Sequence, residues 1–224
     1  MKIDVLTLFP KMLEGFLSES MIGRAIRSKQ VTINVHNVRD WSTDPNNNVD
    51  DRPFGGGAGM VLQVEPLLAA LNQLRTPSSH VIYLCPDGQS LKTKRVQELA
   101  HYEHLILISG HYENIDERIR NFCVHEEISI GDYVLTNGTL PAAVLMDAIV
   151  RYIPGVLGAQ ESLEQDCFHN PLLSYPQYTR PAKFDNWETP KVLFSGNHEA
   201  IDQWRFQQQL VRTLRKRPDL IFNT

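Results

Sequence analysis

The sequence predicts an α/β fold with a mostly parallel sheet, followed by a small, mainly helical C-terminal domain. Over the first 153 residues, short runs rich in β-branched residues alternate with amphipathic stretches of helical length, which is typical of a parallel sheet covered by helices. After Gly158 the sequence pattern changes: prolines recur, and the last part of the chain is one long amphipathic stretch.

Five strands are expected from apolar runs of strand length, at residues 3–8, 31–37, 81–85, 105–109 and 124–130. Six helices are expected from a 3.6-residue apolar period, at residues 11–17, 21–28, 65–74, 92–101, 115–122 and 140–152. Thr139 is a candidate N-cap of the last helix, and Pro141 is tolerated in its first turn. This helix is apolar almost all round, so we expect it to be buried in the domain or at a subunit contact.

The C-terminal part begins with a polar stretch, residues 159–170, which we interpret as a mobile linker. Prolines at 171, 176, 181 and 190 then predict irregular backbone. Asn197 is expected to cap a final helix that runs to Arg217 and stops at Pro218. The apolar stripe predicted for this helix is Ile201, Trp204, Val211 and Leu214. The basic residues predicted on another face are Arg205, Arg212 and Lys216.

Composition places the chain among ordinary soluble proteins, with 224 residues, 42% hydrophobic and 21% charged. No apolar run approaches the roughly 18 residues of a membrane helix. Asp4 stands where a signal peptide has its apolar segment, so we expect a protein that is neither secreted nor membrane-spanning. Three scattered cysteines without a CxxC pair indicate neither a disulfide framework nor a zinc site, and they fit a reducing cytoplasm.

The net charge of −4 argues against a general nucleic-acid coat, but the charge is unevenly distributed. Residues 1–170 hold 14 Lys and Arg against 21 Asp and Glu, whereas residues 171–224 hold 8 against 5. The second part is therefore either a polyanion-binding surface or a solvated charged face.

Glycine-rich loops are the next candidates for a ligand-binding site. The cluster at residues 55–59 lacks the Lys-Ser/Thr pair of a phosphate-binding loop and does not follow a predicted strand, so it is either a conformationally demanding turn or a place of close backbone approach. Three further loops, at residues 84–88, 109–118 and 130–138, each follow a predicted strand. Ligands of open α/β sheets bind at the carboxyl ends of strands, so these loops could together enclose one small molecule with a purine-like edge.

Other candidates are weaker. Asp147 and Arg151 lie four residues apart on a predicted helix, which is the favourable order for an ordinary ion pair. Asp166 is, from the residues alone, a loop carboxylate. A nucleophilic Cys167 assisted by His169 is conceivable, but two residues' separation in a loop does not establish catalytic geometry.

Several motifs occur together in order, at residues 50–57, 110–113, 115–118, 129–135, 151–158 and 195–198. With them, nearly the whole chain closely resembles the bacterial tRNA (guanine-N1)-methyltransferases of the SPOUT class. It departs from their usual pattern at Asn114, Asn137 and Thr139 and in its shorter tail. The first changes bear on loop geometry and cofactor affinity, and the tail on the reach of contacts to tRNA.

The resemblance implies a SPOUT-type fold with a deep trefoil knot in the C-terminal part of the α/β domain, which the rules of protein topology alone would never propose. It implies a knotted catalytic domain at 1–158, a flexible linker at 159–170 and a tRNA-binding domain at 171–224. It also implies a cytoplasmic homodimer with each active site shared between subunits. The reaction would transfer a methyl group from S-adenosyl-L-methionine to N1 of guanosine 37 of tRNA, next to the anticodon.

The resemblance also assigns roles to residues. Asp166 would be the general base that takes the N1 proton, and Arg151 would stabilise the charge that develops on O6. The residues implied for the cofactor are Tyr83, Leu84, Pro86, Gly110, Tyr112, Glu113, Ile130, Gly131, Asp132, Tyr133, Val134, Leu135, Gly138, Leu140 and Pro141. The residues implied for tRNA are Arg52, Ser195, Asn197, His198, Arg205, Arg212 and Lys216. Relatives also use Mg²⁺, but no ligand cluster in the sequence identifies a site.

Three alternative hypotheses for the function remain. The first is a non-catalytic RNA-binding or assembly factor on the same fold, which needs neither Asp166 nor a cofactor. The second is a methyltransferase of the same fold that acts on another RNA or another atom. The third is a nicotinamide-dependent dehydrogenase, whose dinucleotide fingerprint the sequence lacks.

Overall fold

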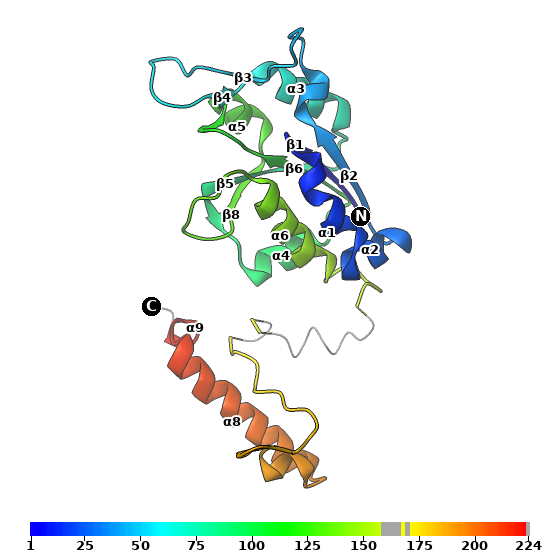
Figure 1. Cartoon of the computed structure of the whole chain (residues 1–224), viewed down its shortest axis with the longest axis vertical. Helices are drawn as coiled ribbons and strands as arrows, with labels where there is room; N and C mark the ends of the chain where they lie inside the picture. The colour runs from blue at the N-terminus through cyan, green and yellow to red at the C-terminus, as the bar shows by residue number, and fades with distance from the viewer. Residues whose placement is uncertain (158–166, 169–170, 223–224) are drawn as a thin grey trace. The chain divides into compact units, whose positions relative to one another are not determined.

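A five-stranded sheet with every strand pair parallel forms the centre of the first part of the chain (Figure 1). The computed structural model describes residues 1–157, 167–168 and 171–222, and the chain divides into two compact units, Met1–Gly158 and Ala159–Thr224. The strand order is β2-β1-β6-β5-β8, with bounds β1 Lys2–Thr7, β2 Thr32–Asn37, β5 Ser79–Ser90, β6 His104–Ser109 and β8 Glu126–Ser129. The prediction of an α/β fold with a mostly parallel sheet is confirmed. The trefoil knot stays a prediction.

Helices cover both faces of this sheet (Figure 1). One face carries α1 Glu14–Ser18, α2 Ser20–Arg27, α4 Thr93–Leu99 and α6 Thr139–Val150, and the other carries α3 Val64–Leu74 and α5 Glu117–Cys123. Leu105 and Leu107 of β6 face the first helix layer, and Ile106 and Ile108 face the second. Because side chains alternate along a strand, a central strand covered on both sides must be apolar at every position, as this run is.

Short elements complete the first unit. The 3₁₀ helix η1, Pro10–Leu13, precedes α1, so the helix predicted at 11–17 is divided into two turns of different kind. A second 3₁₀ helix, η2 Val38–Trp41, follows β2. A small second sheet joins β3 Asp50–Asp51, β4 Val61–Leu62 and β7 Asn114–Ile115, with β4 in the middle. Sequence reasoning missed these strands, because two residues are too few to show a period.

The start of α6 corrects one detail of the sequence analysis. Thr139 is not the N-cap, because Gly138 occupies that position and the Asn137 side chain accepts a hydrogen bond from the Thr139 amide at 2.9 Å. The Thr139 hydroxyl is instead buried, 2.8 Å from the Thr7 hydroxyl and 3.0 Å from that of Ser109. These hydroxyl contacts fasten the start of α6 to the ends of β1 and β6. Most of α6 is buried as expected, although Leu140 and Val144 are about half exposed.

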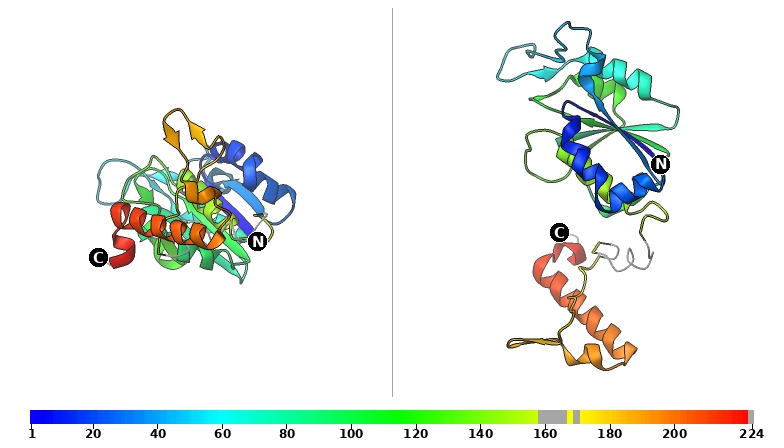
Figure 2. Two further views of the ribbon diagram at one scale, coloured as in Figure 1. Left: turned by 90° about the horizontal axis from the view of Figure 1, so that it is seen from below. Right: turned by 45° about the vertical axis from the view of Figure 1, so that its right-hand side comes forward.

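The second unit contains the hairpin β9 Lys183–Phe184 and β10 Trp187–Glu188, the 3₁₀ helix η3 Lys191–Phe194, and helices α8 His198–Lys216 and α9 Asp219–Phe222 (Figure 2). The capping prediction is confirmed, since the Asn197 side chain accepts a hydrogen bond from the Ala200 amide. Most of the predicted linker lies outside the described residues.

The apolar stripe predicted for α8 is wrong at two positions. Ile201 is buried, but Val211 and Leu214 are 59% and 43% exposed. The face that packs within the unit instead includes Thr213, whose hydroxyl accepts a hydrogen bond from the Leu173 amide at 2.8 Å. The face of α8 that packs within the unit therefore differs from the predicted stripe at these positions, although Trp204 of the stripe does lie near a ring of the preceding segment, that of Tyr178 at 6.4 Å. Among the described residues, no helix is both long enough and apolar enough to cross a membrane.

A buried carboxylate anchors the amino-terminal ends of the central strands. Asp4 of β1 is fully buried and accepts hydrogen bonds from Asn34 at 2.9 Å, His36 at 2.8 Å and His104 at 2.6 Å, and Lys2 lies 2.7 Å away. Burial raises the pKa of Asp4, but these hydrogen bonds outweigh burial and hold the pKa at about 2. Asp4 therefore joins β1 to both of its neighbours, β2 and β6.

The Asp4 cluster predicts how stability responds to acid. The folded-state pKa of Asp4 lies below its ordinary value of 3.8, so its stabilisation is complete above about pH 4 and is lost as the pH falls toward 2. Asp4→Asn should lower the free energy of unfolding at neutral pH by about 3 kcal/mol. It should also flatten the acid dependence of that free energy by about 2 kcal/mol. Urea unfolding across the acid range measures both effects, and parallel pH curves for the two proteins would contradict the assignment.

Candidate functional site

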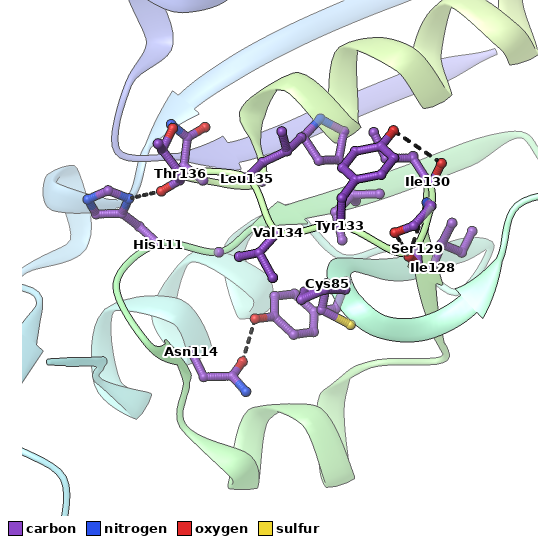
Figure 3. A pocket seen from close by; sticks show the side chains of 18 of the residues that line it. Cys85, His111, Asn114, Ile128, Ser129, Ile130, Tyr133, Val134, Leu135 and Thr136 are labelled. Atoms are coloured by element: carbon purple, nitrogen blue, oxygen red, sulfur yellow. Dashed lines mark hydrogen bonds between the residues drawn. The ribbon is translucent and has the colours of Figure 1, made fainter. Parts of the chain in front are cut away.

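A pocket opens where the carboxyl ends of β5, β6 and β8 meet (Figure 3). Its wall is made by the three loops that follow these strands and by the start of α6. Counting the part open to solvent, it holds about 610 Å³ of empty space, which is within the range of small-molecule sites. The structure thus brings the three glycine-bearing loops together around one cavity.

An interruption in β5 shapes one side of the pocket. Leu84 and Gln89 are both register partners of Ile128 in β8, so the residues between them leave the ladder. This excursion places Cys85 and Pro86 on the pocket wall.

Most residues that the sequence analysis nominated for a cofactor line this pocket. Those on the wall are Tyr83, Leu84, Pro86, Gly110, Tyr112, Glu113, Ile130, Gly131, Tyr133, Val134, Leu135, Gly138 and Pro141. Asp132 and Leu140 are not among the residues that line this pocket, and their assignment to the cofactor stays a prediction. Asp132 is exposed at the apex of a tight turn, in which the Tyr133 amide donates to the Gly131 carbonyl at 2.9 Å. Leu140 is about half exposed in the first turn of α6, beside Pro141, which does line the pocket.

Sequence reasoning missed several wall residues, namely Cys85, His111, Asn114, Ile128, Ser129, Thr136 and Asn137. They lie in or beside the three loops, so their location alone could have identified them. The prediction selected mainly glycine, aromatic and aliphatic residues from these loops and therefore omitted them. Asn114 has a clear structural role, since its side-chain oxygen accepts hydrogen bonds from the Tyr83 hydroxyl and from the Ile115 amide (Figure 3). His111 in turn bonds the Thr136 carbonyl at 3.1 Å and links two of the loops.

The loop after β8 presents an apolar surface to the pocket. Tyr133, Val134 and Leu135 are exposed, although their side chains are of kinds that usually bury (Figure 3). Exposed apolar side chains on a concave wall beside backbone N–H and C=O groups suit a flat heterocycle that needs both stacking and edge recognition.

Two titratable groups of the wall, Cys85 and Tyr83, are held neutral. Burial, with the nearby Asp87, raises the pKa of the Cys85 thiol to about 12. Burial likewise raises the pKa of the Tyr83 hydroxyl above its ordinary value. Neither group is a thiolate or phenolate at neutral pH, so neither is an activated nucleophile.

Two of the loops touch through their backbones at Gly138. Its amide donates to the Gly110 carbonyl at 2.8 Å, and a Cβ at this position would lie 2.8 Å from the Gly110 nitrogen and 2.9 Å from the Ser109 Cα. Main-chain atoms of a buried strand have no room to retreat, so only glycine fits here. This contact closes the pocket between the end of β6 and the start of α6.

One group of side chains in the described residues has the spacing of metal ligands, namely Cys85, Asp87 and Glu127. It does not suit Mg²⁺, which prefers several oxygen ligands. The Arg120 guanidinium already lies 2.7 Å from Asp87 and 2.7 Å from Glu127, and the Cys85 thiol is protonated. The cluster is therefore an ion-pair network in which the Arg120 guanidinium balances the two carboxylates.

The residues predicted for chemistry are placed only in part. Arg151 is the C-cap residue of α6, exposed and not on the pocket wall, and Asp147 lies exposed one turn earlier. Asp166 and His169 lie outside the described residues. The Cys167 sulfur lies 3.0 Å from the Ser174 hydroxyl and 3.2 Å from its amide.

The residues predicted for tRNA fall in both units. Arg52 is exposed in the first unit, between β3 and β4. In the second unit, Ser195 and Asn197 bond main-chain groups at the start of α8, where His198 is exposed. Along α8, Lys216 is exposed, whereas Arg205 and Arg212 are half-buried, and their assignment to tRNA stays a prediction. The Arg205 guanidinium lies over the Tyr175 ring at 4.9 Å.

Comparison with known proteins gives one family and several relatives that share one enzyme name. The family described as tRNA (Guanine-1)-methyltransferase TrmD matches residues 1–223. A tRNA (guanine-N(1)-)-methyltransferase of Staphylococcus haemolyticus is 53% identical over 222 residues, which cover 99% of this chain and 91% of that protein. Proteins of the same name from Moorella thermoacetica and Carboxydothermus hydrogenoformans are 52% and 50% identical, covering 99% of this chain and 90% and 87% of theirs.

The backbone contact at Gly138 leads to a stability prediction. Gly138→Ala should lower the free energy of unfolding by about 1–3 kcal/mol, because the added methyl overlaps main-chain atoms of β6 and its loop. Gly15→Ala is the matched control, since a Cβ at Gly15 in α1 meets nothing within 4 Å. Thermal unfolding of both variants tests the contact, and equal midpoints would show that the loops do not touch there.

Proposed function

The chain belongs to the tRNA (guanine-N1)-methyltransferase family, and on that premise we propose that it transfers a methyl group from S-adenosyl-L-methionine to N1 of guanosine 37 of tRNA. The observation that carries the proposal is the pocket at the carboxyl ends of β5, β6 and β8, together with the family match over nearly the whole chain. A parallel sheet places ligands at this edge, and the three loops offer the surface that a nucleoside needs.

The wall fits an adenosyl group in its chemistry. Tyr133, Val134 and Leu135 would pack against the adenine ring, and main-chain groups near Gly110 and Gly138 would meet its polar edge. The carboxylate of Glu113, also on the wall, would balance positive charge on the methionine part. When bound, S-adenosyl-L-methionine supplies a methyl group already activated on a sulfonium, so the protein's task is alignment and proton removal.

Proton removal falls to Asp166. Guanine N1 carries a proton and is a poor nucleophile until that proton leaves. A carboxylate within hydrogen-bonding distance of N1 takes it as the new bond forms. Asp166 matches the family's base, and the one carboxyl side chain among the wall residues is that of Glu113, which is assigned to the cofactor.

Charge stabilisation falls to Arg151. As N1 loses its proton, negative charge spreads to O6, and a guanidinium directed at O6 lowers the energy of that state. Arg151 ends α6, the helix whose first turn forms part of the pocket wall. In a homodimer, the site that Arg151 serves would be shared between subunits.

The division of labour follows the two units. Residues 1–158 would form the knotted catalytic domain, residues 159–170 the flexible linker, and residues 171–224 the tRNA-binding domain. The protein would act in the cytoplasm. The excess of basic residues after position 170 supports this division. Arg52, Ser195, Asn197, His198, Arg205, Arg212 and Lys216 remain the proposed tRNA contacts.

The proposed reaction predicts a specific product. The wild-type protein should add one methyl group to an unmodified tRNA transcript with guanine at position 37, and none to a transcript with adenine there. Nuclease digestion and mass spectrometry locate the methyl group on N1. Methylation at another nucleotide or atom would favour the related methyltransferase reading, and binding without methylation would favour the non-catalytic one.

The assignment of the base predicts a selective loss. Asp166→Asn should reduce kcat at least about 100-fold, because the amide does not take the N1 proton. Binding of S-adenosylhomocysteine, measured by calorimetry, should stay unchanged. Glu164→Gln, two residues away, is the matched control and should keep wild-type kcat. Wild-type turnover by folded Asp166→Asn protein would exclude Asp166 as the base.

A further inference from the structure

An aromatic side chain stands unpacked on the loop between β3 and β4. Phe54 is fully exposed, and neighbouring Arg52 is exposed as well. A phenylalanine side chain stabilises a fold when it is buried, so a fully exposed one contributes no such stability. None of the pocket residues and none of the proposed roles accounts for Phe54.

The loop that carries Phe54 is built onto the pocket wall. Its strand β4 pairs with β7, and the Glu113 amide at the start of β7 donates to the Met60 carbonyl at 3.0 Å. Gly59 packs so closely on the Glu113 side chain that a Cβ there would lie 2.3 Å from Glu113 Cγ. Glu113 itself lines the pocket. Gly59 is five positions after Phe54, so the two Cα atoms lie within about 18 Å of each other.

The glycines after Phe54 leave its ring unobstructed. Gly55, Gly56 and Gly57 all have positive φ, and a Cβ at any of them would meet nothing within 4 Å. Packing therefore does not exclude side chains here. The backbone conformation favours glycine, and the result is a segment without side chains beside one aromatic ring.

A nucleic acid fits this combination better than a protein surface does. Unpaired RNA bases are held by stacking on aromatic rings, and arginines beside them bind the phosphates. Here an exposed ring and an exposed arginine lie two residues apart on a loop whose base contacts the pocket wall, and Phe54 is the only large hydrophobic side chain exposed between Arg52 and Met60.

We propose that Phe54 stacks on an unpaired base of the anticodon loop beside the guanine to be methylated, while Arg52 binds an adjacent phosphate. This inference rests on the proposed function and adds a contact that holds the target nucleotide at the mouth of the pocket. Stacking is tolerant of base identity, so Phe54 contributes affinity and placement rather than sequence choice.

The test compares Phe54→Ala with Phe54→Tyr, which keeps the ring. Phe122→Ala is the matched control, because Phe122 of α5 is 82% exposed in the same unit and does not line the pocket. Phe54→Ala should weaken binding of a tRNA transcript and raise its KM by roughly ten-fold. Phe54→Tyr and Phe122→Ala should match the wild type, and all should bind S-adenosylhomocysteine equally.

A 2-aminopurine placed next to the target guanine reports stacking directly. The wild type and Phe54→Tyr should change its fluorescence on binding, and Phe54→Ala should not. Wild-type tRNA affinity and fluorescence response in Phe54→Ala would overturn the inference while methylation by the wild type still upholds the proposed function. A loss of self-association in Phe54→Ala, seen by sedimentation, would assign the ring to a second copy of the chain instead. Absence of methylation by the wild type would defeat both.

Discussion

The site depends on the main-chain contact between Gly138 and the end of β6. Without a side chain at Gly138, the loop after β8 lies directly on the Ser109–Gly110 backbone, and its amide bonds the Gly110 carbonyl. Beside it, the buried Thr139 hydroxyl joins the hydroxyls of Thr7 and Ser109. These contacts hold the start of α6 against the carboxyl ends of the central strands. The pocket exists because three loops that are distant in sequence are fixed around this point.

Other side chains at the pocket wall and behind it keep the local charge balanced. Arg120 balances the carboxylates of Asp87 and Glu127, while the Cys85 and Tyr83 side chains keep their protons. A wall of this kind offers stacking surfaces and main-chain polar groups but no nucleophile of its own. It suits a reaction in which the transferred group arrives already activated and the protein aligns it, with the proton-accepting carboxylate supplied from another segment.

The small sheet of β3, β4 and β7 connects this pocket to the outer surface. Through it, Glu113 and Asn114 on the wall share hydrogen bonds with the base of the loop that carries Arg52 and Phe54. The glycine cluster at residues 55–59, which the sequence left as a demanding turn or a place of close backbone approach, therefore belongs to the same structural unit as the site. Its glycines are needed for their backbone conformation, and they leave the neighbouring aromatic ring open to solvent.

The sequence by itself determined the five strands, most of the helices, the cap at Asn197 and the loops that form the pocket, because these follow from local periodicity and from where parallel strands end. Only the tertiary structure decided that Thr139 bonds two strands rather than capping its helix, that Cys85 and His111 join the pocket wall, and that Val211 and Leu214 face solvent. Each of these depends on what another part of the chain places opposite the residue. A side chain's local pattern gives its direction on an element, but the partner that it meets is set by contacts between segments far apart in sequence.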